Sequence, residues 1–333
     1  MHLLLVIASI FCAVVPMVFF LGLLWLSDRY DREPLWLVLL TFVWGATGAV
    51  FIALPLNTAF SMFASGFGGE LMIWLGLPFD WTHLISPILG APLFEEPAKA
   101  LFLLFLAWNR RPHDMSSGFL YGAAAGLGFG MSENFMYFTG VAVDPQSWMM
   151  TVTIRTFYSA LLHAMASSVV GAAFGFARLR GFRRTVLYTG LGLCIAMGLH
   201  GLFNGLLSFD ELSVFDLRTA NFVLLPLEVL FVLFVWQVTL FDDSLSIRRE
   251  LEEEEDTGVL PKDQSWKLAS WWRRMFTDII PPGVERARYI QTATALARRK
   301  RQLKLLGDRS PAFYRDDVRR LRRQLILLLE THE

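Results

Sequence analysis

Long apolar runs separated by short polar segments dominate the first 241 residues of the chain. A transmembrane helix needs about 20 consecutive, mostly apolar residues. The pattern therefore predicts an all-α fold, a polytopic membrane helix bundle of about seven transmembrane helices. The predicted spans are residues 3–26, 35–60, 84–107, 118–140, 150–176, 185–208 and 219–241. Residues 61–83 are either an outer loop or a re-entrant segment.

Basic residues are concentrated in alternate loops, and this gives the predicted spans an orientation. Cytoplasmic loops carry an excess of Lys and Arg. Arginines follow the first, third and fifth spans, whereas the loops after the second, fourth and sixth spans are mainly acidic. We therefore expect a multi-pass protein of the cell membrane with its N-terminus outside and its C-terminal tail in the cytoplasm.

The charge pattern changes abruptly at Asp242. The 333 residues contain 30 Lys+Arg and 30 Asp+Glu, of which 19 basic and 16 acidic residues follow Phe241. This composition excludes a two-domain soluble enzyme and gives no basic domain for nucleic acid. We expect a membrane domain over residues 1–241 and a cytoplasmic helical tail over 242–333 that binds anionic lipid, a cytoplasmic partner or itself. Predicted tail helices are an interfacial one at 265–276 and two basic ones at about 284–306 and 312–330.

Ionisable side chains inside a bilayer are costly, and each is a functional candidate by default. At 1.5 Å rise per residue, the buried acids and imidazoles of four predicted spans fall in one slab between the midplane and the outer surface. We do not expect a purely structural role for all of these residues, and we take them as the candidate catalytic group. Its members are Glu95, Glu96, Glu133, His163 and His200.

Helical spacing adds supporting polar residues to this group. Lys99 follows the paired acids by three and four residues, so its ammonium group can neutralise one of them on the same helix face. Asn204 lies one turn after His200, and Asn134 ends a stripe of small residues that predicts close helix packing. Arg155 is predicted to snorkel towards the outer surface or to pair with Glu228. The small-residue stripe is Gly118, Gly122, Gly126 and Gly130.

Carboxylates and imidazoles in a low-dielectric cavity support two kinds of chemistry. They can activate water for hydrolysis, directly or through a metal, or they can relay protons in a transporter. The sequence contains no GxSG serine motif, no GxGD aspartyl motif and no HExxH zinc helix. The acids and imidazoles themselves must therefore carry the chemistry.

Four sequence elements, in order on successive predicted spans, resemble the PrsW family of intramembrane proteases. The stretch Phe94–Lys99 resembles the family's EExxK motif, and Phe129–Asn134, which reads FGMSEN, resembles FxxxEN. His163 with Gly171 resembles HxxxxxxxG, and His200 with Asn204 resembles HxxxN. The segment Asp28–Pro34 is also similar to the loop that follows the family's first helix.

The resemblance implies a membrane-embedded endopeptidase that cleaves membrane-anchored proteins, such as an anti-sigma factor. The predicted depth of the candidate group, in the outer half of the bilayer, indicates a cut near the extracytoplasmic end of the substrate. It also implies kinship with CAAX prenyl endopeptidases and bacteriocin-immunity proteins. In that wider group a Glu of the paired acids and a His activate water, while a His and an Asn stabilise the oxyanion. By this likeness Glu95 or Glu96 is the general base, and His200 with Asn204 polarises the scissile carbonyl. Glu133 stands where the wider group commonly has a histidine.

The sequence leaves two alternatives open. The protease is either of a glutamic type without metal or a metalloprotease that holds Zn²⁺ through Glu96, Glu133, His163 and His200. The second class of function is a non-proteolytic membrane protein, either a proton-coupled transporter or an immunity-like protein on the same fold.

Overall fold

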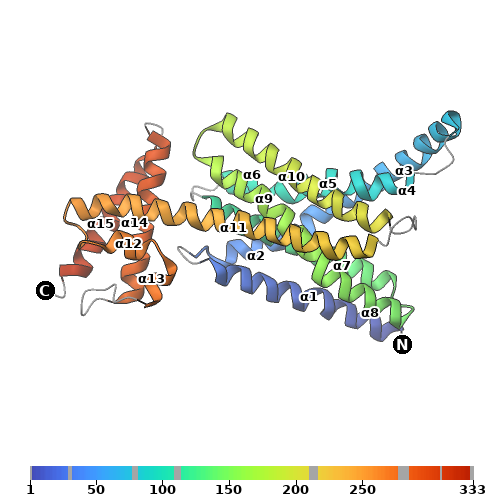
Figure 1. Ribbon diagram of the computed structural model, residues 1–333, viewed down its shortest axis with the longest axis horizontal. Coiled ribbons are helices and arrows are strands. Elements are labelled where there is room, and N and C mark those ends of the chain that lie inside the picture. The colour runs from blue at the N-terminus through green and yellow to red at the C-terminus, as the bar shows by residue number, and fades with distance from the viewer. Residues whose placement is uncertain are drawn as a thin grey trace.

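The computed structural model describes residues 2–28, 32–76, 82–108, 114–209, 217–276, 285–307 and 310–330. Within these ranges all regular structure is helical, as predicted (Figure 1). The elements before the long helix α11 are α1 (His2–Ser27), α2 (Leu35–Trp44), η1 (Gly45–Ala49), α3 (Val50–Leu75), α4 (Thr82–Ile85), η2 (Ser86–Gly90), α5 (Ala91–Ala100), α6 (Phe102–Trp108), α7 (Met115–Gly140), α8 (Pro145–Ile154), η3 (Arg155–Ser159), α9 (Ala160–Arg178) and α10 (Phe182–Phe209). From α11 onwards they are α11 (Leu217–Asp256), α12 (Gln264–Leu268), α13 (Trp271–Phe276), α14 (Arg286–Leu306) and α15 (Ala312–Glu330).

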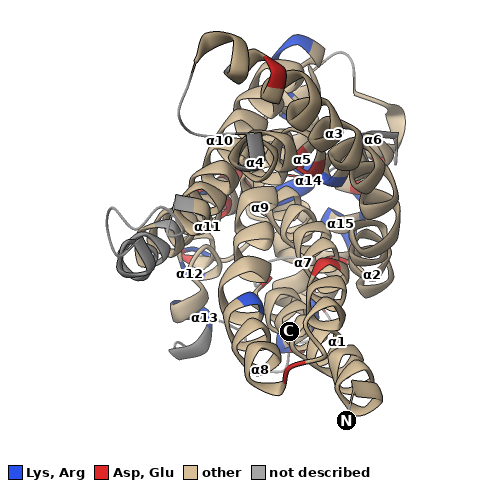
Figure 2. Cartoon of the chain, turned by 90° about the vertical axis from the view of Figure 1, so that its right-hand side faces the viewer, with Lys and Arg blue, Asp and Glu red and all other residues tan. Residues whose placement is uncertain are grey.

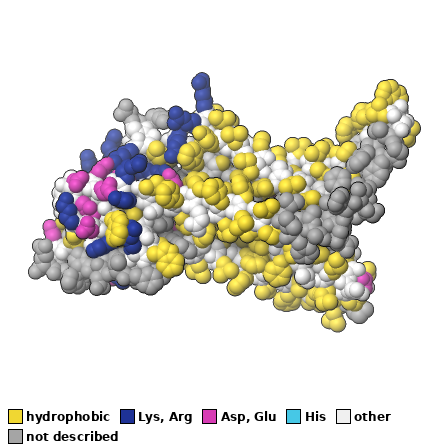
Figure 3. Space-filling model, in the orientation of Figure 1, with side chains coloured by type: hydrophobic (Ala, Val, Ile, Leu, Met, Phe, Trp, Pro, Cys, Tyr) yellow, Lys and Arg dark blue, Asp and Glu magenta, His cyan; other side chains and the backbone are white. Residues whose placement is uncertain are grey.

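The helices form an elongated bundle whose surface is apolar. Hydrophobic side chains cover the exposed face of the bundle, whereas charged side chains gather on the C-terminal helices (Figure 3). Viewed along the bundle, few positions are charged, and those on α5 lie among the surrounding helices (Figure 2). In the described part of the chain, five helical segments are long and apolar enough to cross a membrane: His2–Ser27, Leu35–Leu75, Pro145–Arg178, Phe182–Ser208 and Val229–Asp256. The chain is therefore a helical membrane protein.

The other two predicted spans are helical, and much of each is buried in the bundle. Residues 84–107 are broken into α4, η2, α5 and α6, and α5 carries two acids and a lysine. Residues 118–140 lie in α7, whose first half is buried almost without interruption and is rich in Gly and Ala. A helix enclosed by other helices does not need the apolar surface of a lipid-facing one. The count of seven spans remains a prediction.

Helix α3 extends further than the sequence indicated. Residues 61–75 were expected to form an outer loop or a re-entrant segment, but the helix continues to Leu75. The apolar character also continues, with Ile73 and Trp74 strongly exposed near its end. Residues 77–81 lie outside the described part of the chain.

The predicted close packing along the glycine stripe of α7 is confirmed. The stripe faces α9, and a Cβ atom at Gly122 would lie 2.1 Å from the carbonyl oxygen of Ser167. A Cβ atom at Gly126 would lie 2.1 Å from the carbonyl oxygen of His163. Since no side chain fits there, α9 rests directly on the backbone of α7, and this contact fixes the position of His163 relative to α7.

The C-terminal helices pack around the end of α11, which continues without a break from its apolar part through Asp242 to Asp256. The two predicted basic helices are confirmed as α14 and α15. The single interfacial helix expected at 265–276 is wrong, since the chain forms α12 and α13 with a break between them. Side chains donate hydrogen bonds to backbone carbonyl groups at this break. Arg274 donates to the carbonyl oxygen of Leu268, and Ser244 donates to that of Ala269. The core of this unit contains Ile247, Leu251, Leu268, Tyr289, Leu296 and Leu325.

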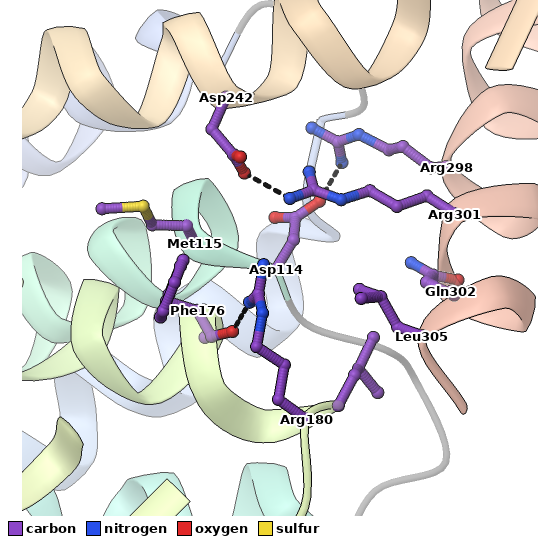
Figure 4. Close-up of a pocket in the computed structure, with 11 residues that line it drawn as sticks. Asp114, Met115, Phe176, Arg180, Asp242, Arg298, Arg301, Gln302 and Leu305 are labelled. Atoms are coloured by element: carbon purple, nitrogen blue, oxygen red, sulfur yellow. Dashed lines mark hydrogen bonds and ion pairs between the residues drawn. The ribbon is translucent and has the colours of Figure 1, made fainter. Parts of the chain in front are cut away.

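Ion pairs join α14 to the end of the bundle where α7 begins (Figure 4). The Arg298 guanidinium lies 3.6 Å from Asp114, the N-cap of α7, and 3.2 Å from Asp243 on α11. Arg301 pairs with Asp242 at 2.6 Å. Burial alone would raise the pKa of Asp114, but Arg298 and the hydrogen bonds from Ser117 hold this pKa at about 2. Asp114 is therefore ionised at neutral pH, as both its capping role and its ion pair require.

Glu33, just before α2, gives a pH-dependent stability prediction. Its two carboxylate oxygens accept hydrogen bonds from the hydroxyls of Ser117 and Tyr121, at 2.5 and 2.7 Å. Burial raises the pKa of Glu33 to about 7 against these bonds. The ordinary pKa of this carboxyl group is 4.5, so between pH 4.5 and pH 7 the folded state keeps a proton that the unfolded state releases. The free energy of unfolding therefore falls as pH rises through this range.

Replacing Glu33 by glutamine removes this titration. Glu33→Gln is expected to stabilise the protein by about 1–3 kcal/mol at pH 8 and much less at pH 5. Thermal unfolding in detergent at both pH values measures the difference. An equal change in Tm at pH 5 and pH 8 would contradict the prediction.

Candidate active site

The paired acids on α5 have different surroundings. Glu96 is enclosed: its Oε1 lies 2.7 Å from Lys99 Nζ and 2.9 Å from His200 Nδ1, and Ser167 donates to its Oε2 at 3.1 Å. Lys99 lies 3.9 Å from Glu95, so the predicted neutralisation falls mainly on Glu96. Glu96 is thus engaged through both of its oxygens.

Glu95 keeps one oxygen free. Its Oε1 accepts a hydrogen bond of 3.0 Å from Asn57 Nδ2 on α3. Its Oε2 is buried without a hydrogen-bond partner and lies 3.9 Å from His200 Nε2. Of the two acids, Glu95 is therefore the one with an acceptor available for a ligand or for water.

Glu133 and His163 form a second pair across α7 and α9. The Nε2 atom of His163 lies 2.7 Å from Glu133 Oε2, and its Nδ1 lies 2.9 Å from Lys99 Nζ. Because Lys99 also contacts Glu96, this lysine links the two halves of the group. The rings of His163 and His200 meet edge to face, with their centroids 4.9 Å apart. The structure thus brings all five of the candidate catalytic acids and imidazoles together.

The predicted supporting residues also reach this group, with different partners than expected. Arg155, in the π-helical turn η3, pairs with Glu133 at 2.6 Å and stacks over the ring of Tyr137. It does not snorkel to the surface, since its side chain is only 14% exposed. The side chain of Glu228 lies outside the described part of the chain. Asn134 donates to the backbone carbonyl of Arg155 at 3.4 Å and so holds this turn.

Asn204 contacts the backbone of a neighbouring element. Its Nδ2 donates to the carbonyl oxygen of Pro87 in η2, at 2.8 Å. This bond uses one of the two N–H groups of the amide, and the contact of Asn204 with a substrate carbonyl stays a prediction. Asn204 therefore fixes η2, which leads directly into α5 and the paired acids.

A cavity of about 990 Å³ opens onto this cluster. It lies between α3, α5, α7, α9 and α10, and both apolar and polar side chains line it. Among its lining residues are Asn57, Glu95, Glu133, Arg155 and His163. A cavity of this size can accept a segment of extended peptide next to Glu95.

Sequence reasoning missed Asn57 and Ser167. Both belong to helices with spaced small or apolar residues, and neither lies in a motif. The sequence signal for Asn57 is its polar amide within the apolar run that begins α3, two residues after Pro55. Ser167 lies among several small residues of α9, and nothing in the sequence distinguishes it from them.

One group of donor atoms could hold a metal ion. Ligand atoms of Glu95, His163 and His200 all lie within 4.8 Å of one another, and all three residues are buried. The group contains both expected histidines, but it has Glu95 in place of the expected Glu96 and does not include Glu133. Carboxylate and imidazole are suitable ligands for Zn²⁺, and the contact of His200 Nδ1 with Glu96 is of the kind that orients a metal-binding histidine. His163 fits only after its contacts change: its Nδ1 accepts from Lys99 and its Nε2–H donates to Glu133, so one of these contacts must break before the ring can bind a metal.

Comparison with known proteins agrees with this geometry. The chain is similar to Protease PrsW of Bacillus subtilis (strain 168), with 25% identity over 202 residues that cover 60% of this chain and 83% of the relative. It is 27% identical over 199 residues to Protease PrsW of Geobacillus kaustophilus (strain HTA426), covering 60% and 79%. Protease PrsW of Clostridioides difficile (strain 630) is 26% identical over 236 residues, covering 68% and 87%.

No solved structure matches the chain. The model of the PrsW family of intramembrane metalloproteases matches residues 33–238, a range that contains every member of the cluster described above. The match favours the protease over the transporter and the immunity-like protein. The chain therefore belongs to the PrsW family and is an intramembrane protease.

Proposed function

We propose that this protease hydrolyses a peptide bond of a membrane-anchored protein in the cavity between α3, α5, α7, α9 and α10, with Glu95 as the general base. The observation that carries this assignment is the free Oε2 of Glu95, a buried acceptor in the cavity wall beside His200. A general base must have a free acceptor within reach of the water that it deprotonates. Glu96 has no such acceptor, because Lys99, His200 and Ser167 occupy its oxygens.

The other residues hold the reacting groups in place. Glu96 and Lys99 orient His200 and His163 through hydrogen bonds to their Nδ1 atoms, at 2.9 Å each. Because its Nδ1–H donates to Glu96, His200 presents the lone pair of Nε2 towards Glu95. Glu133 forms an ion pair with Arg155 and accepts a hydrogen bond from Nε2 of His163. Asn204 supports the site through Pro87.

Metal dependence is part of the proposal. Glu95, His163 and His200 are the residues that would hold a divalent ion such as Zn²⁺, provided that one carboxylate oxygen of Glu95 is left to accept the proton of water, and a bound ion there would polarise a carbonyl group and acidify water. We expect the purified protein to contain about one equivalent of metal per chain. Chelation is expected to abolish cleavage, and re-addition of Zn²⁺ is expected to restore it. Metal analysis of the wild type and of His200→Ala checks this, and full activity of a metal-free preparation would contradict it.

The topology suggests the kind of substrate. With the N-terminus outside and the tail in the cytoplasm of a multi-pass cell-membrane protein, the cluster lies in the outer half of the bilayer. A single-pass protein would then be cut near its extracytoplasmic end, as an anti-sigma factor would be at the first step of a signalling cascade. The paired acids and the His200–Asn204 spacing also suggest distant kinship with CAAX prenyl endopeptidases and bacteriocin-immunity proteins.

Purified protein in liposomes, mixed with a single-pass reporter, tests the substrate assignment. A cut in the extracytoplasmic half of the reporter's membrane segment is expected. Mass spectrometry of the products locates it, and a cut confined to the cytoplasmic side would contradict the proposed topology.

A further inference from the structure

Asn57 contacts Glu95 from a helix that carries none of the motif residues. It lies on α3, and its amide reaches across to α5, where Nδ2 donates to Glu95 Oε1 at 3.0 Å. Both residues line the cavity. A hydrogen bond to an ionised acceptor is stronger and shorter than one between neutral groups, so this contact restrains the carboxylate strongly.

Other contacts already hold α3 and the preceding helix against α5. Trp44 Nε1 donates to the carbonyl oxygen of Ala98 at 3.2 Å. One turn after Asn57, the ring of Phe60 packs edge-on against Phe94, with centroids 5.7 Å apart. Gly90 allows this approach, since a Cβ atom there would lie 2.5 Å from the Phe60 ring. The helices therefore do not depend on Asn57 for their packing, and its hydrogen bond needs another reason.

Two acceptors remain unused at this contact. Asn57 Oδ1 and Glu95 Oε2 are both buried, and neither has a hydrogen-bond partner within the described residues. Leaving a buried acceptor unpaired costs about 1–3 kcal/mol, so two at one site call for a donor that arrives from the cavity. A single water molecule has two O–H groups, which equals the number of unpaired acceptors at this contact.

We propose that Asn57 positions both the general base and the attacking water, a proposal that rests on the proposed function. Its Nδ2 holds Glu95 Oε1, which leaves Oε2 directed towards the water, and its Oδ1 accepts the hydrogen that the water keeps. Glu95 takes the other proton as the water oxygen bonds to the carbonyl carbon of the peptide. When the C–N bond breaks, Glu95 returns this proton to the leaving nitrogen, so the products are a carboxylic acid and an amine.

Two substitutions separate this role from a structural one. Asn57→Ala removes both the donor and the acceptor, whereas Asn57→Asp keeps the shape and places a second acceptor against Glu95. We expect kcat to fall by about 10- to 100-fold in both variants, as for other residues that orient a catalytic ligand. KM is expected to change by less than about twofold, because the interaction is made with the water and not with the substrate.

Thr58→Val is the matched control. Thr58 also lines the cavity from α3, but its hydroxyl donates to the carbonyl of Leu54 in its own helix. We expect its Tm to stay close to wild type. Should Asn57→Ala fail to accumulate as folded protein, Asn57→Asp gives the same comparison.

Infrared spectroscopy adds a readout that does not depend on activity. The carboxylate stretching band of Glu95, assigned by its loss in Glu95→Gln, is expected to shift in Asn57→Ala and to stay in place in Thr58→Val. An unshifted band or an unchanged kcat in Asn57→Ala would overturn the assignment of Asn57. If the wild type cleaves no reporter at all, the proposed function itself fails, which is a distinguishable result.

Discussion

Replacement of Glu95 by glutamine is expected to lower kcat for peptide cleavage by about 100- to 10,000-fold, the usual contribution of a general base. Glutamine has nearly the same shape and can still accept the hydrogen bond from Asn57 through its carbonyl oxygen. It cannot take a proton from water, so the fold should survive while the reaction does not. Reporter cleavage and thermal unfolding, measured on the same preparation, check both parts.

Glu96→Gln is the companion variant, and its main defect is expected in stability. The substitution leaves the ammonium group of Lys99 buried without its close carboxylate partner, which lies 2.7 Å away in the wild type. Breaking a buried ion pair on one side costs about 3–5 kcal/mol. If Glu96→Gln is as stable as the wild type and inactive, while Glu95→Gln still cleaves, the roles of the two acids are the reverse of those proposed.

Replacement of Gly122 by valine is expected to destabilise the protein by forcing two packed helices apart. A Cβ atom at this position would lie 2.1 Å from Ser167 O and 3.0 Å from Ser168 Cα, both of them backbone atoms of α9. Helix α9 must therefore move away from α7, and overpacking of this kind costs about 1–3 kcal/mol or more. Because α9 carries His163, the loss of folded protein should come with a loss of activity in the fraction that remains folded.

Gly140→Ala on the same helix is the control for this substitution. Nothing lies within 4 Å of a Cβ atom at Gly140, so the alanine variant should unfold close to the wild-type temperature. Thermal unfolding in detergent and the yield of monodisperse protein measure both variants. A Gly122→Val protein with wild-type Tm would contradict the direct backbone contact between α7 and α9.

Much of the fold and the membership of the site could be predicted from the sequence. The bilayer leaves few places for ionisable groups, so Glu95, Glu133, His163 and His200 stood out against apolar surroundings and proved to be neighbours. The four-residue spacing of small residues predicted the α7 contact, because only small side chains allow backbones so close.

The finer geometry depended on packing that no single helix encodes. Adjacent residues on a helix point about 100° apart, so Glu95 and Glu96 face different neighbours, and only the placement of α3, α9 and α10 decides which acid meets the cavity. Asn57 was not recognised because its partner lies 38 residues away in the sequence. The sequence predicted a contact of the Asn204 amide with the substrate carbonyl, but it did not predict the hydrogen bond from this amide to the carbonyl oxygen of Pro87 in η2.

The most direct measurement is cleavage of a single-pass reporter by the purified protein in liposomes made up in H₂¹⁸O. Hydrolysis by water that Glu95 activates predicts one cut, with ¹⁸O in the new carboxyl terminus of the wild-type product, and an intact reporter with Glu95→Gln. An intact reporter with metal-loaded, folded wild-type protein, or a cut that persists in Glu95→Gln, would contradict Glu95-based hydrolysis in this cavity.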